Sequence, residues 1–341
     1  MPEREWYSSV EHGGALTQAC RLYGGTLDSW LDLSTGINPN PVVLPDIEQS
    51  IWNRLPDEDL ERRACEAAAG YFDLPDGILP LCVPGTQAAI QRLPAVMPGH
   101  VTILGPTYGE YHRCFSRAGC IIETVAEYRR LEARGGNAII VNPNNPDGRV
   151  LSSEAVLELE QRISAGGGYL IVDEAFADVA PEVSVAAHAG NSRRLVVLRS
   201  FGKFFGLAGL RIGYVIAPDR ILALLRSELG PWAVSGPALA LSVAMMSDDA
   251  CVEEIRLSLA ERHSALDGVL TAAGLDIIGG TDLFTLVHAP EAGRLHHNLC
   301  RQHILVRKFS DHPGWLRFGL TPDPAADARL LDGLVQSIAA L

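Results

Sequence analysis

Residues 200–214 read SFGKFFGLAGLRIGY and combine a serine, a lysine and an arginine with four glycines. Ser200 stands three residues before Lys203, and Arg211 stands eight residues after it. Ser200 and Arg211 can therefore converge on a phosphate group while Lys203 reaches an aldehyde on the same ligand. The plainer interpretation is a glycine-rich turn with an exposed lysine. We expect residues 200–214 to form the centre of a ligand site.

Lysine is rare in this chain, because only Lys203 and Lys308 occur among 28 Lys and Arg residues. Arginine fills nearly every other position that carries a positive charge. Imine formation requires a primary amine that can lose its proton, whereas a guanidinium group stays protonated. Lys203 is thus the candidate for covalent chemistry, and Lys308, which follows Arg307 directly, is the weaker choice.

The composition excludes several classes of protein. The chain has 341 residues and a formal net charge of -13, which argues against a general nucleic-acid binder. Charged residues near the start and the lack of a long apolar run predict a cytoplasmic protein without membrane contact. No CxxC pair is present, so we expect reduced core thiols and neither disulfides nor a metal site. The seven cysteines are Cys20, Cys65, Cys82, Cys114, Cys120, Cys251 and Cys300.

Short apolar runs alternate with helical patterns between residues 78 and 217, which predicts a large α/β domain with a mostly parallel sheet between helices. The expected strands are 78–83, 101–104, 121–125, 138–141, 169–173, 195–200 and 211–217, and the expected helices include 86–97 and 152–164.

After residue 237 the pattern predicts a smaller α+β domain. Its expected helices are 238–246, 252–273, 294–303 and 324–340, and its expected strands are 284–288, 304–309 and 315–320. The proline- and glycine-rich start predicts an arm with little regular structure. We therefore expect an N-terminal arm over 1–40, a large domain over 41–235 and a small domain over 236–341.

Two further loops follow expected strands at the edge where open α/β sheets bind ligands. Residues 142–148 read NPNNPDG, which is typical of a plain turn, but Asn145 there can also donate to a ring hydroxyl or phenolate. The expected strand 169–173 ends in Asp173, whose carboxylate can cap the following helix. Alternatively, Asp173 can keep the nitrogen of a pyridine ring protonated and so make the ring an electron sink.

The order Asn145-Pro146, Asp173, Ser200-x-x-Lys203 and Arg211 resembles the fold-type I pyridoxal 5'-phosphate (PLP) enzymes of the aspartate aminotransferase superfamily. The resemblance implies an imine between Lys203 and the cofactor, and contacts to its other groups. These contacts are Asp173 to the pyridine nitrogen, Asn145 to the ring oxygen, Ser200 and Arg211 to the phosphate, Gly85-Thr86-Gln87 at a phosphate-binding helix start, and Tyr108 stacked on the ring.

Within that superfamily the chain most resembles the threonine-phosphate decarboxylases of cobalamin biosynthesis, a sister family of the histidinol-phosphate aminotransferases. The similar segments are His12-Gly13-Gly14, residues 31–39, residues 304–307 and residues 316–320. The resemblance implies decarboxylation of threonine phosphate, a homodimer and substrate binding by five residues, namely His12, Gly36, Asn38, Arg307 and Arg317. We expect Arg307, with His12, to hold the substrate phosphate. Arg317 then holds the carboxylate upright or shares the phosphate.

Two departures from the family pattern affect this hypothesis. Phe176 stands where many relatives have a tyrosine that contacts the cofactor oxygen. Leu55 stands where aminotransferase relatives often place a tyrosine that reaches the partner's cofactor phosphate. The second departure weakens the case for transamination, although a histidinol-phosphate-type aminotransferase stays the alternative. A non-catalytic module and a nicotinamide dehydrogenase are disfavoured, because Lys203 and Asp173 are present and no GxGxxG opens the first helix.

Overall fold

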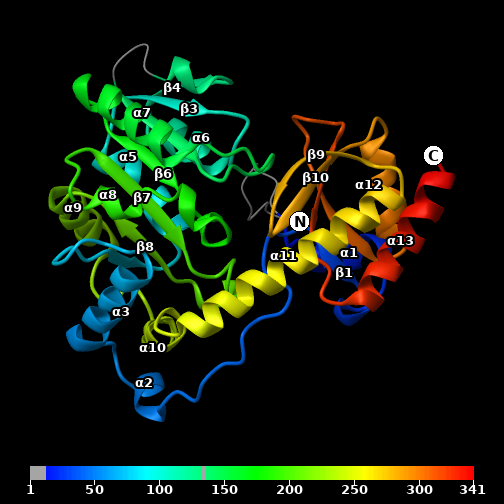
Figure 1. The fold of residues 1–341 in the computed structure, drawn as a ribbon, viewed down its shortest axis with the longest axis horizontal. Helices are drawn as coiled ribbons and strands as arrows, with labels where there is room; N and C mark the ends of the chain where they lie inside the picture. The colour runs from blue at the N-terminus through cyan, green and yellow to red at the C-terminus, as the bar shows by residue number, and fades with distance from the viewer. Residues whose placement is uncertain (1–12, 132–135) are drawn as a thin grey trace, which may run out of the picture. The chain divides into compact units, whose positions relative to one another are not determined.

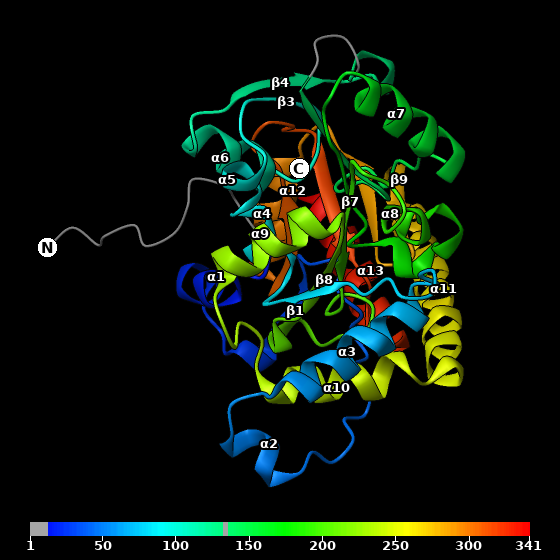
Figure 2. The same cartoon turned by 90° about the vertical axis from the view of Figure 1, so that its left-hand side faces the viewer.

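The computed structural model describes residues 13–131 and 136–341, which form two compact units. Unit 2 comprises Asn40–Ser258, and unit 1 combines the described part of Met1–Pro39 with Leu259–Leu341. This division differs from the expected boundaries at residues 40 and 235. The N-terminal residues belong to the smaller unit, and α10 (Gly236–Met246) stays with unit 2, where it packs beside α3 (Glu58–Tyr71; Figure 2).

Unit 2 is built on a mixed, mostly parallel sheet, as expected for the α/β class. The sheet has the strand order β2-β8-β7-β6-β5-β3-β4, in which β8 runs antiparallel to both of its neighbours. The strands are β2 (Leu81–Val83), β3 (His100–Leu104), β4 (Ile121–Val125), β5 (Asn137–Val141), β6 (Leu170–Asp173), β7 (Leu195–Ser200) and β8 (Gly213–Ile216).

Alternate strand residues face opposite sides of this sheet, and both sides are covered (Figure 1). Ile139, Ile171 and Leu198 belong to a core that includes residues of four helices, namely α4 (Thr86–Ile90), α5 (Leu93–Val96), α6 (Glu110–Arg117) and α9 (Asp219–Leu229). Helices α7 (Ser153–Ala165) and α8 (Ala186–Ala189) contact β6 and β7 respectively. A short helix, α2 (Gln49–Asn53), precedes α3. This arrangement explains why several of the strands are apolar throughout.

The helix expected over residues 86–97 is divided into α4 and α5. Pro94 lies in the first turn of α5, and its backbone nitrogen carries no hydrogen that could bond to a carbonyl of the preceding turn. Short 3-10 helices connect other elements at Leu27–Ser29, Tyr128–Arg130, Ala177–Val179, Pro181–Val183 and Ala208–Leu210.

Unit 1 contains a five-stranded sheet with the order β1-β11-β12-β10-β9. Its strands are β1 (Leu31–Leu33), β9 (Asp276–Thr281), β10 (Phe284–His288), β11 (Ile304–Lys308) and β12 (Trp315–Gly319). Its helices are α1 (Leu16–Tyr23), α12 (Ala292–Arg301) and α13 (Pro324–Ala339), while α11 (Asp249–Ala272) begins in unit 2 and ends in unit 1. In the part of the chain that the structure describes, no helix combines the length and apolar character needed to cross a membrane.

The expectation of an irregular N-terminal arm is wrong for residues 16–33. The strand β1 pairs in parallel with β11, where Leu31 is opposite Ile304 and Leu33 is opposite Val306. The helix α1 buries Ala19 in a cluster with Trp30, Cys300 and Leu305. These contacts join segments that are far apart in sequence, so a local composition rich in glycine and proline does not reveal them.

Candidate functional site

Four of the expected cofactor residues converge in unit 2, and we call Gly85, Thr86, Ser200 and Arg211 the Arg211 cluster. Ser200 is opposite Gly213 in the β7–β8 pair, and a Cβ placed on Gly213 would lie only 3.0 Å from the Thr86 amide nitrogen. A Cβ on Gly85 would lie 2.6 Å from Nη2 of Arg211, and Gly85 has a φ of +74°. Only glycine fits here, so its backbone approaches the guanidinium closely.

Arg211 itself is exposed and lies in the left-handed region with a φ of 56°. Its Nη1 donates to the carbonyl of Ala208 at 3.0 Å, within the same glycine-rich turn. Left-handed backbone is costly for a residue other than glycine and persists where the surrounding structure enforces it. The turn therefore places a guanidinium beside the backbone of Gly85, which has no side chain, and this arrangement is suitable for binding an anion.

Lys203 follows Ser200 by three residues and is half-buried. Its Nζ lies 4.7 Å from the centroid of the Phe176 ring. Burial raises the pKa of the Asp173 carboxyl and the charge of Lys203 partly opposes this rise, so the amine and the carboxylate belong to one electrostatic environment. The structure thus brings together the two residues that the sequence predicts to carry the chemistry.

Asp173 ends β6 and is 3% exposed. Its Oδ1 accepts the backbone N–H of Ala175 at 3.0 Å, and its Oδ2 accepts the hydroxyl of Tyr111 at 2.9 Å. Burial raises the pKa of Asp173 above its usual value, while Lys203, Tyr111 and Ala175 favour the charged form. Asp173 does not cap the following 3-10 helix, whose N-cap is Phe176. Its carboxylate instead binds the hydroxyl of Tyr111, which comes from another element.

Tyr111 is a residue that the sequence analysis did not assign. It lies on α6, is wholly buried, and its ring is perpendicular to that of Tyr108 at a centroid distance of 6.3 Å. Tyr108 precedes α6, which begins at Glu110, so the two rings meet at the start of this helix. The closeness of Tyr111 to Tyr108 in the sequence was the available indication that Tyr111 lies near the site.

Tyr108 is held by a chain of side chains. Its hydroxyl donates to Oε1 of Gln87 at 3.1 Å, and Nε2 of Gln87 donates to Oε2 of Glu110 at 2.7 Å. Glu110 is 1% exposed and pairs with Arg113 one turn along α6. The chain connects the expected stacking residue to the start of α4, which also carries Thr86.

The loop 142–148 is ordered by two asparagines that were not singled out. Asn142 exchanges hydrogen bonds with the backbone of Leu151 at 2.9 Å each. Oδ1 of Asn144 accepts the hydroxyl of Thr107 at 2.6 Å, and Nδ2 of Asn144 donates to Asp147 at 2.7 Å. The expected ligand donor, Asn145, follows Asn144 and is half-buried, while the backbone N–H of Asn142 donates to the carbonyl of Asp173.

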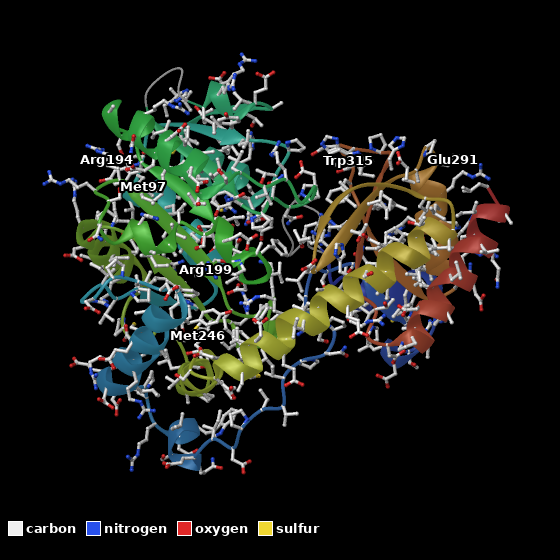
Figure 3. The ribbon with its side chains drawn as sticks, viewed as in Figure 1. Met97, Arg194, Arg199, Met246, Glu291 and Trp315 are labelled. Atoms are coloured by element: carbon white, nitrogen blue, oxygen red, sulfur yellow. The ribbon has the colours of Figure 1, made fainter. Side chains whose placement is uncertain are left out.

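A second polar network lies behind Asp173 and was also missed. Arg199, labelled in Figure 3, donates from Nη1 to Glu174 at 2.9 Å and from Nη2 to Asp178 at 2.8 Å. Burial opposes the charge of Arg199, but the two carboxylates raise its pKa above its usual value. Glu174 follows Asp173, and Arg199 precedes Ser200, so this network ties together the ends of β6 and β7.

The expected substrate residues of unit 1 form a group of their own. Arg307 is opposite Arg317 in the β11–β12 pair, so both side chains lie on one face of the sheet. Arg317 is 6% exposed and its Nη2 donates to the carbonyl of Ser34 at 3.1 Å. Burial, and to a smaller extent Arg307, lowers the pKa of Arg317 to about 9.

The loop that follows β1 supplies the remaining candidates in unit 1. Ser34 Oγ accepts the backbone N–H of Gly14 at 2.7 Å, and Gly36 and Asn38 are buried farther along the loop. His12 lies outside the described residues. Arg307 and Arg317 place two guanidinium groups on one face of the β11–β12 pair, which favours an anionic ligand.

Comparison with known proteins identifies the family of this chain. The sequence profile of the family "Aminotransferase class I and II" matches residues 30–334. A threonine-phosphate decarboxylase from a Sinorhizobium species is 51% identical over 96% of this chain and 98% of that protein. Another from Pseudomonas aeruginosa is 41% identical over 94% of this chain and 96% of that protein.

Solved structures support the same fold. The histidinol-phosphate aminotransferase of Clostridium acetobutylicum superposes with a TM-score of 0.80 at 22% identity, covering 91% of this chain and all of that one. The fold similarity extends through both units and agrees with the expected fold class. Since the family profile covers most of the sequence and two curated relatives match nearly its full length, the chain belongs to the aminotransferase class I and II family.

Proposed function

We propose that this chain is a PLP-dependent carboxy-lyase that converts L-threonine O-3-phosphate to (R)-1-aminopropan-2-yl phosphate and carbon dioxide, a step of cobalamin biosynthesis. The observation that carries the proposal is the 51% identity to a threonine-phosphate decarboxylase over 96% of the chain. The Arg211 cluster, Lys203 and Asp173 supply the chemical basis for it.

The residues of unit 2 fit PLP as a group. The Arg211 cluster offers a guanidinium beside backbone that has room only for glycine at position 85, which suits the cofactor phosphate. Lys203 provides the primary amine that binds the aldehyde, and Asp173 provides a buried carboxylate for the pyridine nitrogen. We assign Asn145 to the ring oxygen, Tyr108 to one face of the ring, and Gln87, with Gly85 and Thr86, to the helix start that binds the cofactor phosphate. When bound, the cofactor supplies an electron sink for the bond that breaks at Cα.

The protein's own contribution begins with Asp173. With PLP bound, its ionised form would hold a proton on the pyridine nitrogen, and the charge of Lys203 and the hydrogen bonds from Tyr111 and Ala175 oppose the burial that raises its pKa. Lys203 Nζ would then be the group that returns a proton to Cα after carbon dioxide leaves. Phe176 places an apolar ring instead of a hydroxyl beside Nζ, so one hydrogen bond of the wider family is absent from this position.

Substrate recognition falls to unit 1. We assign the substrate phosphate to Arg307, with His12 as its partner, because a planar guanidinium matches the oxygens of a phosphate. Arg317 would then hold the substrate carboxylate in an orientation that lets it depart, or share the phosphate with Arg307. Gly36 and Asn38 line the same loop as Ser34 and complete the assigned set.

A homodimer belongs to the proposal. The N-terminal part of unit 2 exposes large apolar side chains, with Val43 92%, Trp52 60% and Leu55 65% exposed. Exposed apolar side chains near one another in sequence indicate a surface that a partner covers. Light scattering at assay concentration tests this point, because an active monomer would contradict it. A cytoplasmic location also stays a prediction, which cell fractionation would test.

The decisive experiment is an assay with phosphothreonine that measures carbon dioxide and, separately, amino transfer to 2-oxoglutarate. A decarboxylase releases carbon dioxide without forming glutamate. The alternative, a histidinol-phosphate-type aminotransferase, forms glutamate from histidinol phosphate and releases no carbon dioxide from phosphothreonine. Glutamate formation as the main outcome would therefore replace our proposal with the alternative.

A further inference from the structure

A pair of buried thiols lies apart from the site described above. Cys65 on α3 and Cys82 on β2 are 5% and 4% exposed, and their Sγ atoms are 3.5 Å apart. Among the described residues, no other two cysteine sulfurs lie within hydrogen-bonding distance. A disulfide has an S–S distance of about 2.05 Å, so these two sulfurs need to approach by about 1.5 Å to form one.

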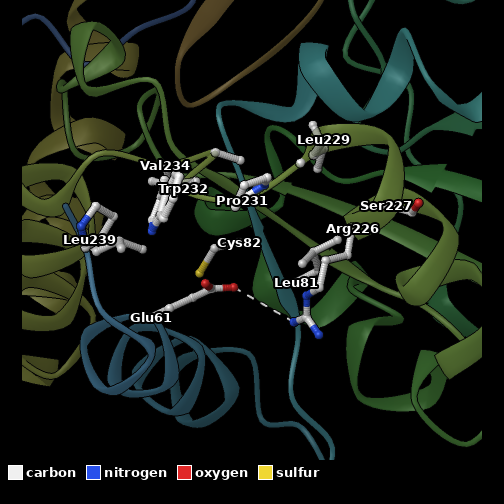
Figure 4. A pocket seen from close by; sticks show the side chains of 13 residues that line it. Glu61, Leu81, Cys82, Arg226, Ser227, Leu229, Pro231, Trp232, Val234 and Leu239 are labelled. Carbon is white, nitrogen blue, oxygen red and sulfur yellow. Dashed lines mark ion pairs between the residues drawn. The ribbon is translucent and has the colours of Figure 1, made fainter.

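Cys82 also lines a pocket of unit 2 with a volume of about 400 Å³ (Figure 4). Glu61 and Arg226 line the same pocket with their charged groups 3.8 Å apart, and their side chains are 42% and 65% exposed respectively. These exposed groups show that the pocket opens to solvent. A small solute can therefore reach the region of Cys82, although the cysteine itself is nearly inaccessible from the outer surface.

The two thiols differ in their ability to lose a proton. The hydrogen bond between the two sulfurs lowers the pKa of Cys65 and raises the pKa of Cys82 well above its usual value. Either sulfur can donate in this hydrogen bond, and Cys82 is the cysteine that lines the pocket. This arrangement suits a dithiol in which one sulfur reacts with a solute and the other then closes the bond.

We propose that Cys65 and Cys82 form a reversible dithiol–disulfide pair that is oxidised by small hydroperoxides entering through this pocket. The proposal goes beyond the decarboxylase function and does not depend on it. It rests on the Sγ–Sγ distance and on the opening of the pocket to solvent.

The oxidation proceeds in two balanced steps. Cys82 Sγ attacks one oxygen of hydrogen peroxide, the S–O bond forms, the O–O bond breaks, and the other oxygen leaves as water with the Cys82 proton. Cys65 Sγ then attacks Cys82 Sγ, the S–S bond forms, the S–O bond breaks, and the hydroxyl group leaves with the Cys65 proton as water. The two sulfurs lose two electrons in total, and the peroxide is reduced to two molecules of water.

The pair lies close to the Arg211 cluster through the sheet. In the β2–β8 register, Cys82 is opposite Tyr214 and Val83 is opposite Gly213, the residue that approaches Thr86. A covalent bond from α3 to β2 would therefore act one strand position from the glycine that contacts this cluster.

The test uses the full-length holoenzyme treated with hydrogen peroxide, followed by alkylation of free thiols, digestion and mass spectrometry. We expect the loss of two free thiols per chain and one cross-linked peptide pair containing Cys65 and Cys82, both reversed by dithiothreitol. The variants Cys65→Ser and Cys82→Ser should lose the cross-link. The matched variant Cys114→Ser, which alters a buried thiol on α6, should retain it.

The proposal is overturned if peroxide leaves both thiols free while it oxidises other cysteines, or if Cys82 advances to the sulfinic acid without a cross-link. If the serine variants fail to fold, the identity of the cross-linked peptides from the unaltered protein decides the question. A cross-link that joins any other two cysteines equally refutes the proposal.

Discussion

Replacing Arg307 by alanine should impair binding of phosphothreonine in a way that can be calculated from its position. Arg307 lies opposite Arg317 on one face of the β11–β12 pair, and its charge contributes to the lowered pKa of Arg317. Such neighbouring cations favour a dianion between them. A hydrogen bond to a charged group contributes about 1.5–3 kcal/mol. Since about 1.4 kcal/mol corresponds to a factor of ten, KM should rise about 10- to 150-fold.

The matched control is Lys308→Ala. Lys308 is the next residue of β11, so its side chain points to the opposite face of the sheet. KM and kcat should be measured for phosphothreonine with both variants, together with the absorption spectrum of the bound cofactor. We expect Arg307→Ala to raise KM without a change in the spectrum, and Lys308→Ala to change neither quantity.

Binding of inorganic phosphate gives a second readout that does not depend on turnover. A ligand that binds only the folded state raises the midpoint of thermal unfolding. Phosphate should therefore stabilise the unaltered protein and Lys308→Ala more than it stabilises Arg307→Ala. An Arg307→Ala protein with unchanged KM and unchanged stabilisation by phosphate would refute the assignment. Equal activity of the unaltered enzyme on threonine and phosphothreonine would remove the phosphate site from the proposal.

Three further changes have defined outcomes. Lys203→Arg should abolish turnover, because a guanidinium group cannot form the imine, and full activity of this variant would contradict the assignment. In the unaltered protein, borohydride reduction should attach a pyridoxyl group to Lys203, which peptide mapping can check. Gly85→Ala should weaken PLP binding in a titration, because the new Cβ would meet the guanidinium of Arg211. The control Gly77→Ala has a φ of +80° but open space around it, so it should only lower the free energy of unfolding by about 1–2 kcal/mol, measured with denaturant. Burial lowers the pKa of His296 to about 4. As the pH is lowered, the unfolded chain therefore binds a proton at His296 before the folded chain does, and the free energy of unfolding should fall from pH 6.5 down to about pH 4. His296→Asn should flatten that profile, and a similar effect of His297→Asn would argue against burial as the cause.

The inner strands of the sheet of unit 2 could be predicted because they are buried on both faces. The strand Leu195–Ser200, which begins with four apolar residues, has the bounds expected from the sequence, and so does the more exposed edge strand Ile121–Val125. The proximity of Asp173, Lys203 and Arg211 could also be predicted, since each follows or precedes a strand at the same edge of the sheet. In these cases, local patterns in the sequence carry the necessary information.

Elements that depend on distant partners could not be predicted in the same way. The strand β1 has three residues, and its pairing with β11 depends on a segment at the other end of the chain. The hydrogen bond from Tyr111 to Asp173 joins residues from α6 and β6, whose relative position follows only from the folded sheet. The same holds for the bonds of Arg199 to Glu174 and Asp178, because a surface arginine and a buried one look alike in a sequence.

The connectivity of the chain favours folding of unit 2 before unit 1. Unit 2 is continuous, so all strands of its sheet have been synthesised by residue 216. The strand β1 must wait for β11, roughly 270 residues later, and closing a flexible loop of that length costs about 5 kcal/mol of entropy. Prior folding of unit 2 removes most of this flexible chain and lowers the cost. A nascent chain that ends before residue 304 therefore carries a complete large sheet, while β1 has no strand with which to pair.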